Sequence, residues 1–188
     1  MARTATVDRT VTACSVQGLT AGRWTIECSR SALKVSVKVG IFATATGRFG
    51  RVTGQVELAE DHLASTVEVA VDTRSLTSGS SSMDALLHGA GIIDSEANPT
   101  ISFVSRALRP AGQDGRWLLD GLLTTDGAVL DVTLDMADPT LAADGALELH
   151  AVGQLSSKDA VRLLSHPGVE KILGRTMALD LVVVVVKD

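Results

Sequence analysis

The chain has 188 residues, of which 45% are hydrophobic and only 3% aromatic, and its formal net charge is −5. This length suits one domain with a substantial core. The charge excludes binding to a nucleic-acid backbone, which needs clustered Lys and Arg, and Arg48 and Arg51 are the nearest approach to a cluster. Because the hydrophobic residues are mainly Val, Leu, Ile and Ala, the sequence predicts an aliphatic interior.

Residues 1–22 are polar and rich in threonine. They lack the apolar run of a secretory signal, so we expect a mobile N-terminal arm, a single domain at residues 23–188 and a cytoplasmic location. In a reducing cytoplasm Cys14 and Cys28 are free thiols, with Cys28 buried in a strand. A Cys14–Cys28 disulfide is the alternative for an exported protein.

From Trp24 onward, hydrophobic and polar residues alternate, which is typical of strands with one buried and one solvated face. Glycines at 47, 50 and 54 predict a sharp bend in the strand that contains them. Short turns such as Asp126-Gly127 and Asp144-Gly145 join antiparallel neighbours. The predicted strands are 24–28 and 32–40 (one broken strand or two), 47–58, 63–71, 100–108, 116–124, 128–136, 146–155 and 177–187.

Helices interrupt this pattern in two places. Residues 82–89 can form two turns with Ser81 or Ser82 as N-cap, and residues 157–164 form a second helix with Ser156 or Ser157 as N-cap. His166-Pro167-Gly168 ends the second helix, and residues 169–173 add a further turn. Since only closure removes sheet edges, we predict an all-β fold, an antiparallel lipocalin-like closed β-barrel of about eight strands with one or two short helices.

Inward positions, counted at period two along each strand, are apolar throughout. A barrel of about eight strands can be filled by side chains or can hold one small ligand, so a structural or interaction barrel with a filled core stays open beside a binding protein. The cavity alternative suits a long apolar molecule. The residues predicted to bind it are Val35, Val37, Phe49, Val67, Val69, Ile101, Phe103, Trp117, Leu119, Val132, Leu134, Leu149, Leu181 and Val183.

Polar residues form no catalytic or metal-binding motif. The sequence has neither the Gly-x-Ser-x-Gly of a nucleophile elbow nor the His-Glu-x-x-His of a zinc site. We therefore predict a protein that is not an enzyme and has no metal or cofactor, with a hydrolase as the least favoured alternative. Isolated or outward-facing polar residues are His62, His88, His150, His166, Asp131, Asp135 and Glu148.

The last predicted strand ends in an unbroken run of valines from Val182 to Val186. The run is too short for a membrane span, and strands buried on both faces have such continuous apolar sequences. We expect its outer face to be covered either by a second copy in a homodimer or by the helices at residues 157–173.

Several short marks occur in a fixed order between Trp24 and Lys187. They are Trp24-Thr25-Ile26 with Ser31, Gly47-Arg48-Phe49 with Gly54, Val71-Asp72 with Ser75-Leu76, Asp84 with Leu87 and Asp94, Pro99-Thr100-Ile101-Ser102-Phe103 with Ser105, and Gly121-Leu122-Leu123. In these marks the chain resembles the YceI-like family of polyisoprenoid-binding, lipocalin-shaped proteins. The resemblance implies a carrier for a polyisoprenoid or fatty-acid-like amphiphile.

The chain departs from the family pattern at three sites. Met83-Asp84-Ala85-Leu86-Leu87 replaces Arg-Asp-x-His-Leu, and Ile92-Ile93-Asp94 replaces Phe-Phe-Asp. Asp159 alone remains of a later Arg-x-Asp-Phe-Gly pattern. The resemblance therefore implies the fold, whereas the identity of the ligand does not follow from it.

Overall fold

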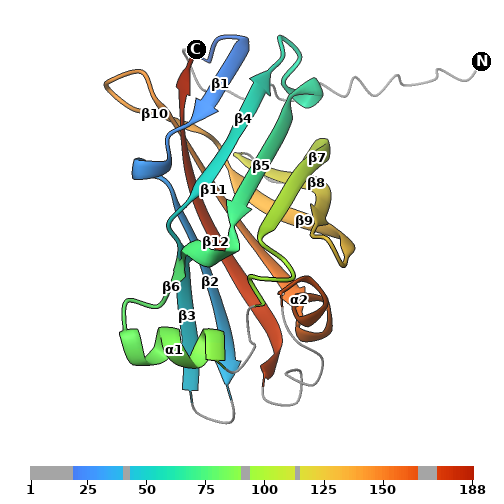
Figure 1. Cartoon of the computed structure of the whole chain (residues 1–188). Coiled ribbons are helices and arrows are strands. Elements are labelled where there is room, and N and C mark those ends of the chain that lie inside the picture. The colour runs from blue at the N-terminus through green and yellow to red at the C-terminus, as the bar shows by residue number, and fades with distance from the viewer. Residues whose placement is uncertain (1–18, 40–42, 90–93, 113–114, 165–172) are drawn as a thin grey trace, which may run out of the picture.

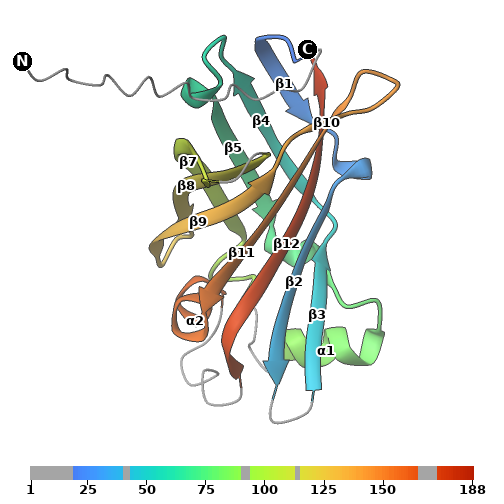
Figure 2. The ribbon, with the colours of Figure 1, turned by 180° about the vertical axis from the view of Figure 1, so that it is seen from behind.

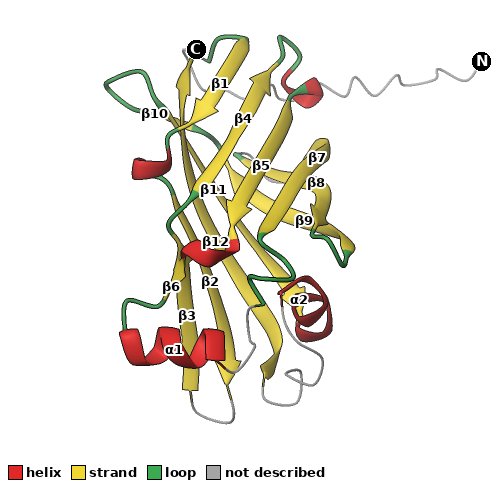
Figure 3. Ribbon diagram, in the orientation of Figure 1, coloured by secondary structure: helices red, strands yellow, loops and turns green. Residues whose placement is uncertain are grey.

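The computed structural model describes residues 19–39, 43–89, 94–112, 115–164 and 173–188 (Figure 1). It consists mostly of strands, with a few short helical segments (Figure 3). In chain order they are β1 Gly22–Ile26, η1 Cys28–Arg30, β2 Ala32–Val39, β3 Ala43–Phe49, β4 Val52–Leu58, η2 His62–Ala64, β5 Thr66–Asp72, η3 Thr73–Ser75, β6 Leu76–Thr77, α1 Ser81–Gly89, β7 Thr100–Pro110, β8 Arg116–Thr124, β9 Val129–Ala137, β10 Thr140–Leu141, β11 Leu147–Ser156, α2 Ser157–Leu164 and β12 Leu173–Lys187.

The strands form a closed antiparallel barrel of eight strands, as predicted. β1 and β2 are two halves of one broken strand, and β3 and β4 are two halves of the next. β12 pairs with β11 on one side and with both β1 and β2 on the other, which closes the barrel (Figure 2). Every barrel strand therefore pairs with its neighbours in sequence, and only the short β6 and β10 extend the sheet beyond the barrel.

A buried serine restores the hydrogen bonds where the first strand breaks. The Ser31 hydroxyl donates to the carbonyl of Glu27 at 2.8 Å and accepts from the Val184 amide at 3.1 Å. The Arg48 guanidinium donates to the Ser31 carbonyl at 2.9 Å. Because buried polar backbone groups need partners, Ser31 and Arg48 stabilise the break between β1 and β2.

The predicted strand 47–58 is corrected to two segments. β3 begins at Ala43, and the chain leaves the sheet at Gly50 and Arg51 before β4. The bend itself is confirmed. Gly54 has φ +152°, and a Cβ on it would overlap the Glu68 carbonyl oxygen on β5, so only glycine allows this close approach.

The last strand begins earlier than predicted, at Leu173 instead of residue 177. Leu173 therefore belongs to β12 and not to a further helical turn, while residues 169–172 of that turn lie outside the described residues. Cys28 begins η1 instead of lying in a strand, and it is half-buried, not fully buried. Cys14 and the N-terminal arm at residues 1–18 also lie outside the described part of the chain.

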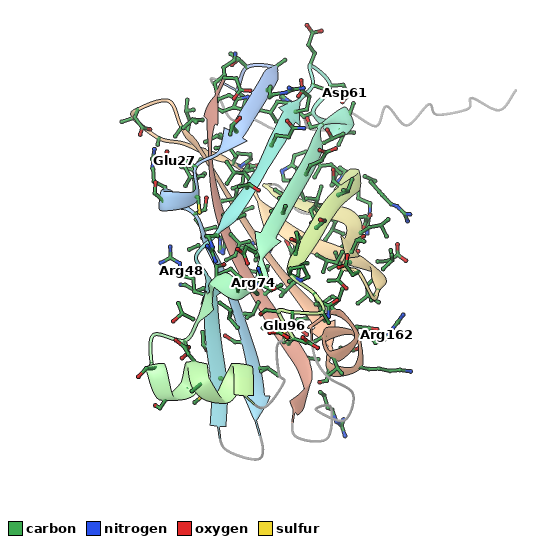
Figure 4. The ribbon with its side chains drawn as sticks, in the orientation of Figure 1. Glu27, Arg48, Asp61, Arg74, Glu96 and Arg162 are labelled. Carbon is green, nitrogen blue, oxygen red and sulfur yellow. The ribbon has the colours of Figure 1, made fainter. Side chains whose placement is uncertain are left out.

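Both predicted helices are present, toward the end of the barrel opposite the C-terminus (Figures 1 and 3). Ser156 is the N-cap of α2, because its hydroxyl accepts from the Asp159 amide at 3.1 Å and donates to the Asp159 carboxylate at 2.6 Å. Ala160 and Leu163 are each 1% exposed and pack into the core, while Arg162 lies outside the barrel (Figure 4). None of the described helices is long and apolar enough to cross a bilayer.

The valine run alternates between the two faces of β12. Leu181 and Val183 face the interior, and the outward Val184 is only 4% exposed. Val184 lies beside η1, since its carbonyl accepts from the Glu27 amide at 2.8 Å. Of the expected cover at residues 157–173, α2 packs at the end of the barrel, and residues 165–172 lie outside the described residues. The homodimer stays a prediction.

Candidate binding site

A cavity of about 140 Å³ lies inside the barrel, and we call it the central cavity. Every barrel strand and α2 contribute to its wall, and all the lining side chains are apolar. They are Leu33, Val35, Phe49, Val56, Val67, Val69, Val71, Ile101, Phe103, Leu119, Leu123, Val132, Leu134, Met136, Leu149, Ala151, Leu155, Leu163, Met177, Leu179, Leu181 and Val183.

All of the residues predicted from the sequence line this cavity, except Val37 and Trp117. Val37 faces inward but is buried in the core at 6% exposure. Trp117 lies near one end of the barrel, where its indole N–H donates to the Asp138 carboxylate at 2.7 Å. The structure thus brings the other predicted residues together around one space, and their contact with a ligand stays a prediction.

Further lining residues were missed, although most continue the same alternation. Leu33 precedes Val35 by two positions, and Met177 and Leu179 precede Leu181 in the same way. Extending each strand at period two would have found them. Leu163 is different, because its position depends on how α2 packs against the barrel end, and a strand pattern contains no such information. The missed residues are Leu33, Val56, Val71, Leu123, Met136, Ala151, Leu155, Leu163, Met177 and Leu179.

A second cavity of about 60 Å³ lies at the barrel end where η2 joins β4 to β5. We call it the end chamber, and Asp61 marks this end in Figure 4. Five of its lining residues also line the central cavity, so a single layer of side chains separates the two spaces. The shared residues are Val56, Val67, Leu119, Met136 and Leu149, and the chamber adds Leu19, Leu58, His62, Ser65, Leu108, Trp117, Ala137 and Pro139.

The end chamber differs from the central cavity in having polar side chains. The Asp61 carboxylate accepts from the Leu63 amide at 3.1 Å and caps η2, which fixes His62 at the chamber. His62 lies in η2 and is half-buried, and its Nδ1 is shielded from solvent with no hydrogen-bond partner among the described residues. The Ser65 hydroxyl accepts from the Ala59 amide at 3.1 Å.

Charged residues of the strands lie on the outer face, as their alternation predicted. Asp131 and Asp135 form exposed ion pairs with arginines, and His150 contacts Asp180 at 2.9 Å. Glu148 is exposed too. Of the other two histidines, the side chain of His88 and the whole of His166 lie outside what the structure describes.

The outer ion pair of Arg109 and Asp120 has shifted pKa values. The Arg109 guanidinium donates to Asp120 at 2.6 Å, and with a further hydrogen bond from Thr133 it lowers the pKa of the Asp120 carboxyl. The same contact raises the pKa of Arg109. Both side chains are partly or largely exposed, so this charge pair has no place at the cavity wall.

The wall of the central cavity suits the binding of an apolar molecule, because none of its lining side chains can donate or accept a proton. General acid–base chemistry needs a titratable group within hydrogen-bond reach of the reacting atoms, and every residue lining the central cavity is apolar. Within the described ranges, no group of three His, Cys, Asp or Glu could hold a metal ion.

Comparison with known proteins gives one family and several similar folds. A sequence profile described as the YceI-like domain matches residues 24–166. BcnA of Burkholderia cenocepacia has a similar fold, with a TM-score of 0.72 and 18% identity over 85% of this chain and 98% of that chain. A Saccharophagus degradans domain described as polyisoprenoid binding gives a TM-score of 0.62 and 12% identity over 90% of this chain and 100% of that chain.

The Campylobacter jejuni YCEI protein gives a TM-score of 0.64 and 15% identity over 80% of this chain and 90% of that chain. At such low identities these likenesses concern the fold alone. Among curated proteins, none matches this chain significantly.

Proposed function

Because the chain belongs to the YceI-like domain family, we propose that it is a non-catalytic carrier that holds a polyisoprenoid or another long lipid-like amphiphile inside its barrel. The observation that supports this most is the central cavity with its wholly apolar wall. The solved Saccharophagus degradans domain described as polyisoprenoid binding has the same fold. Burial of an apolar chain contributes about 25 cal/mol for each Å² removed from water, without any need for hydrogen bonds.

The size of the cavity limits how such a chain fits. An apolar cavity of about 150 Å³ stays dry and accepts a molecule as large as benzene. The 140 Å³ of the central cavity therefore holds roughly one five-carbon isoprene unit as the side chains stand. A longer chain must pass the layer that separates the central cavity from the end chamber. Met136 lies in that layer, and methionine changes its shape easily because it is unbranched and flexible.

A filled structural barrel is the competing interpretation, and the 140 Å³ of space speaks against it. Native cores contain few voids larger than a water molecule. Lack of a titratable group on the central wall likewise supports a carrier over a hydrolase. The cytoplasmic location, the reduced cysteines and the homodimer stay predictions.

A pair of neighbouring substitutions on β7 tests the carrier. Phe103 faces the cavity, while Val104 is 46% exposed on the outer face. We expect Phe103→Glu to abolish the fluorescence increase of diphenylhexatriene on binding, because the charge would enter the apolar space. Val104→Glu should bind the dye like the wild type.

Circular dichroism establishes whether each variant is folded. If Phe103→Glu does not fold, Val69→Thr gives a milder test of the same cavity wall. Native mass spectrometry after organic extraction identifies any lipid that purifies with the protein. A folded Phe103→Glu protein with undiminished dye binding would contradict a central binding cavity.

A further inference from the structure

We propose that the end chamber binds the polar end of the ligand, and that this end is a single uncharged oxygen group, a hydroxyl or a carbonyl. This inference rests on the proposed carrier function and adds to it the orientation and the chemical class of the ligand. The apolar chain then extends from the end chamber into the central cavity, toward the end of the barrel where α2 packs.

The wall that the two cavities share supports this orientation. Val56, Val67, Leu119, Met136 and Leu149 line both cavities. A chain that displaces this one layer of side chains would lie along the barrel with its two ends in different surroundings. The central cavity has only apolar neighbours, whereas polar side chains line the end chamber.

His62 supplies the unused hydrogen-bonding capacity. Its Nδ1 is shielded from solvent without a partner among the described residues, although the residue lines the chamber. A buried polar atom without a hydrogen-bond partner destabilises a protein, and a ligand that supplies the partner removes that penalty. A ligand hydroxyl can satisfy either tautomer of the ring, because it both donates and accepts, and a carbonyl can satisfy a protonated nitrogen.

The neighbouring polar groups leave room for one small partner. Ser65 already accepts from the Ala59 amide, so its hydroxyl proton remains for a ligand oxygen. The Trp117 indole is engaged with Asp138. Two groups, His62 and Ser65, are thus available at the chamber wall, which matches a single oxygen better than a large polar head.

Charge at the chamber disfavours an anionic head. None of the described lining residues is Lys or Arg. Two carboxylates adjoin its lining residues, namely Asp61, which precedes His62, and Asp138, which accepts from the Trp117 indole. A diphosphate or a carboxylate would find no Lys or Arg among these lining residues to neutralise its charge. An uncharged alcohol or carbonyl needs no such cation.

Three ligands with the same fifteen-carbon skeleton test the proposal, namely farnesol, the saturated hydrocarbon farnesane and farnesyl diphosphate. Each competes with diphenylhexatriene for the full-length protein. We expect farnesol to bind about three- to tenfold more tightly than farnesane, the value of one buried hydrogen bond, and farnesyl diphosphate to bind most weakly.

Variants assign the preference to His62. His62→Phe should make farnesol and farnesane equal while it leaves the affinity for farnesane unchanged, because the ring shape is kept and the nitrogens are lost. His62→Gln should retain part of the preference, and it replaces the first variant if His62→Phe does not fold. His150→Phe is the matched control, since His150 lies on the outer face beside Asp180 and its loss should leave the preference intact.

The outcomes separate the two proposals. Equal binding of farnesol and farnesane by the wild type, or tightest binding of farnesyl diphosphate, would overturn the uncharged-head proposal and leave the carrier standing. A preference that survives both His62 substitutions would overturn the role of His62. Failure of all three ligands to displace the dye would count against the carrier function itself.

Discussion

Ala151→Leu should fill the central cavity from its wall. Ala151 is 8% exposed on β11, where it pairs with Met136 of β9 and Leu181 of β12, and it lines the cavity. An empty cavity of 140 Å³ costs about 3 kcal/mol at roughly 24 cal/mol for each Å³. Leucine adds three carbons, each worth about 0.8 kcal/mol when buried, and its lost rotamer freedom costs about 0.5–1 kcal/mol.

We therefore expect Ala151→Leu to raise the free energy of unfolding by about 1–2 kcal/mol, which for a domain of this size raises Tm by roughly 2–8 °C. The same substitution should weaken diphenylhexatriene binding, because leucine and dye compete for one space. Urea unfolding, a thermal melt and a dye titration measure the three quantities. Val152→Leu is the control, since Val152 is the next residue on β11 and is 37% exposed on the outer face.

Two results would refute this reasoning. If Ala151→Leu lowers stability, the wall does not have the space that the structure shows, and overpacking strain dominates. If the variant is more stable but binds the dye like the wild type, the dye binds outside the central cavity. An effect of equal size in Val152→Leu would show that the gain comes from β11 itself and not from filling the space.

Two further substitutions test the backbone and the outer charges. Gly54→Ala should lower the free energy of unfolding in urea by about 1–3 kcal/mol, because φ is +152° and the new Cβ would overlap a β5 carbonyl, whereas Gly50→Ala, with no neighbour nearer than 3.5 Å, should change little. Arg109 and Thr133 lower the pKa of Asp120 in the folded state, so this carboxylate stabilises the fold above its unfolded pKa and the contribution is lost as the pH falls through the lower, folded pKa. Urea unfolding at pH 6 and pH 3 should therefore show a smaller acid loss for Asp120→Asn than for the wild type, and an equal loss would contradict the assignment.

The alternation of residues predicted most of the barrel, because period two states directly which side chains share a face. The alternation did not predict the strand boundaries where neighbouring residues differ little in hydrophobicity. β3 begins in Ala43-Thr44-Ala45-Thr46, a small and weakly apolar sequence, and the partner strand β2 holds it in the sheet. β12 begins at Leu173 and continues with Gly174-Arg175-Thr176, a polar sequence that resembles a loop. Pairing with neighbouring strands determines where β3 and β12 begin, and the sequence of a single strand does not show this pairing.

The candidate site shows the same division. The alternation of residues identified the inward face of each strand, but it does not show how far along the barrel axis a side chain lies. Val37 and Trp117 have the correct face and lie outside the central cavity for this reason. His62 was interpreted as an ordinary loop histidine, because its burial depends on how the Asp61-capped turn packs over the barrel end. Contacts between a turn and distant strands have no periodic signal in the sequence.

Stability and binding compete for the same interior. Around Trp24, Leu147 and Val185 the core is packed to 2%, 0% and 0% exposure, whereas Val69 and Val183 face inward and remain only half-buried beside the central cavity. The first region can hold the barrel closed while the second stays incompletely filled. A ligand that fills the second region binds the folded chain and not the unfolded one, so it must raise the free energy of unfolding as its concentration exceeds Kd. The empty carrier thus has a lower free energy of unfolding than a filled barrel would have. The packing interactions that the empty barrel lacks are those that an apolar chain can make when it enters.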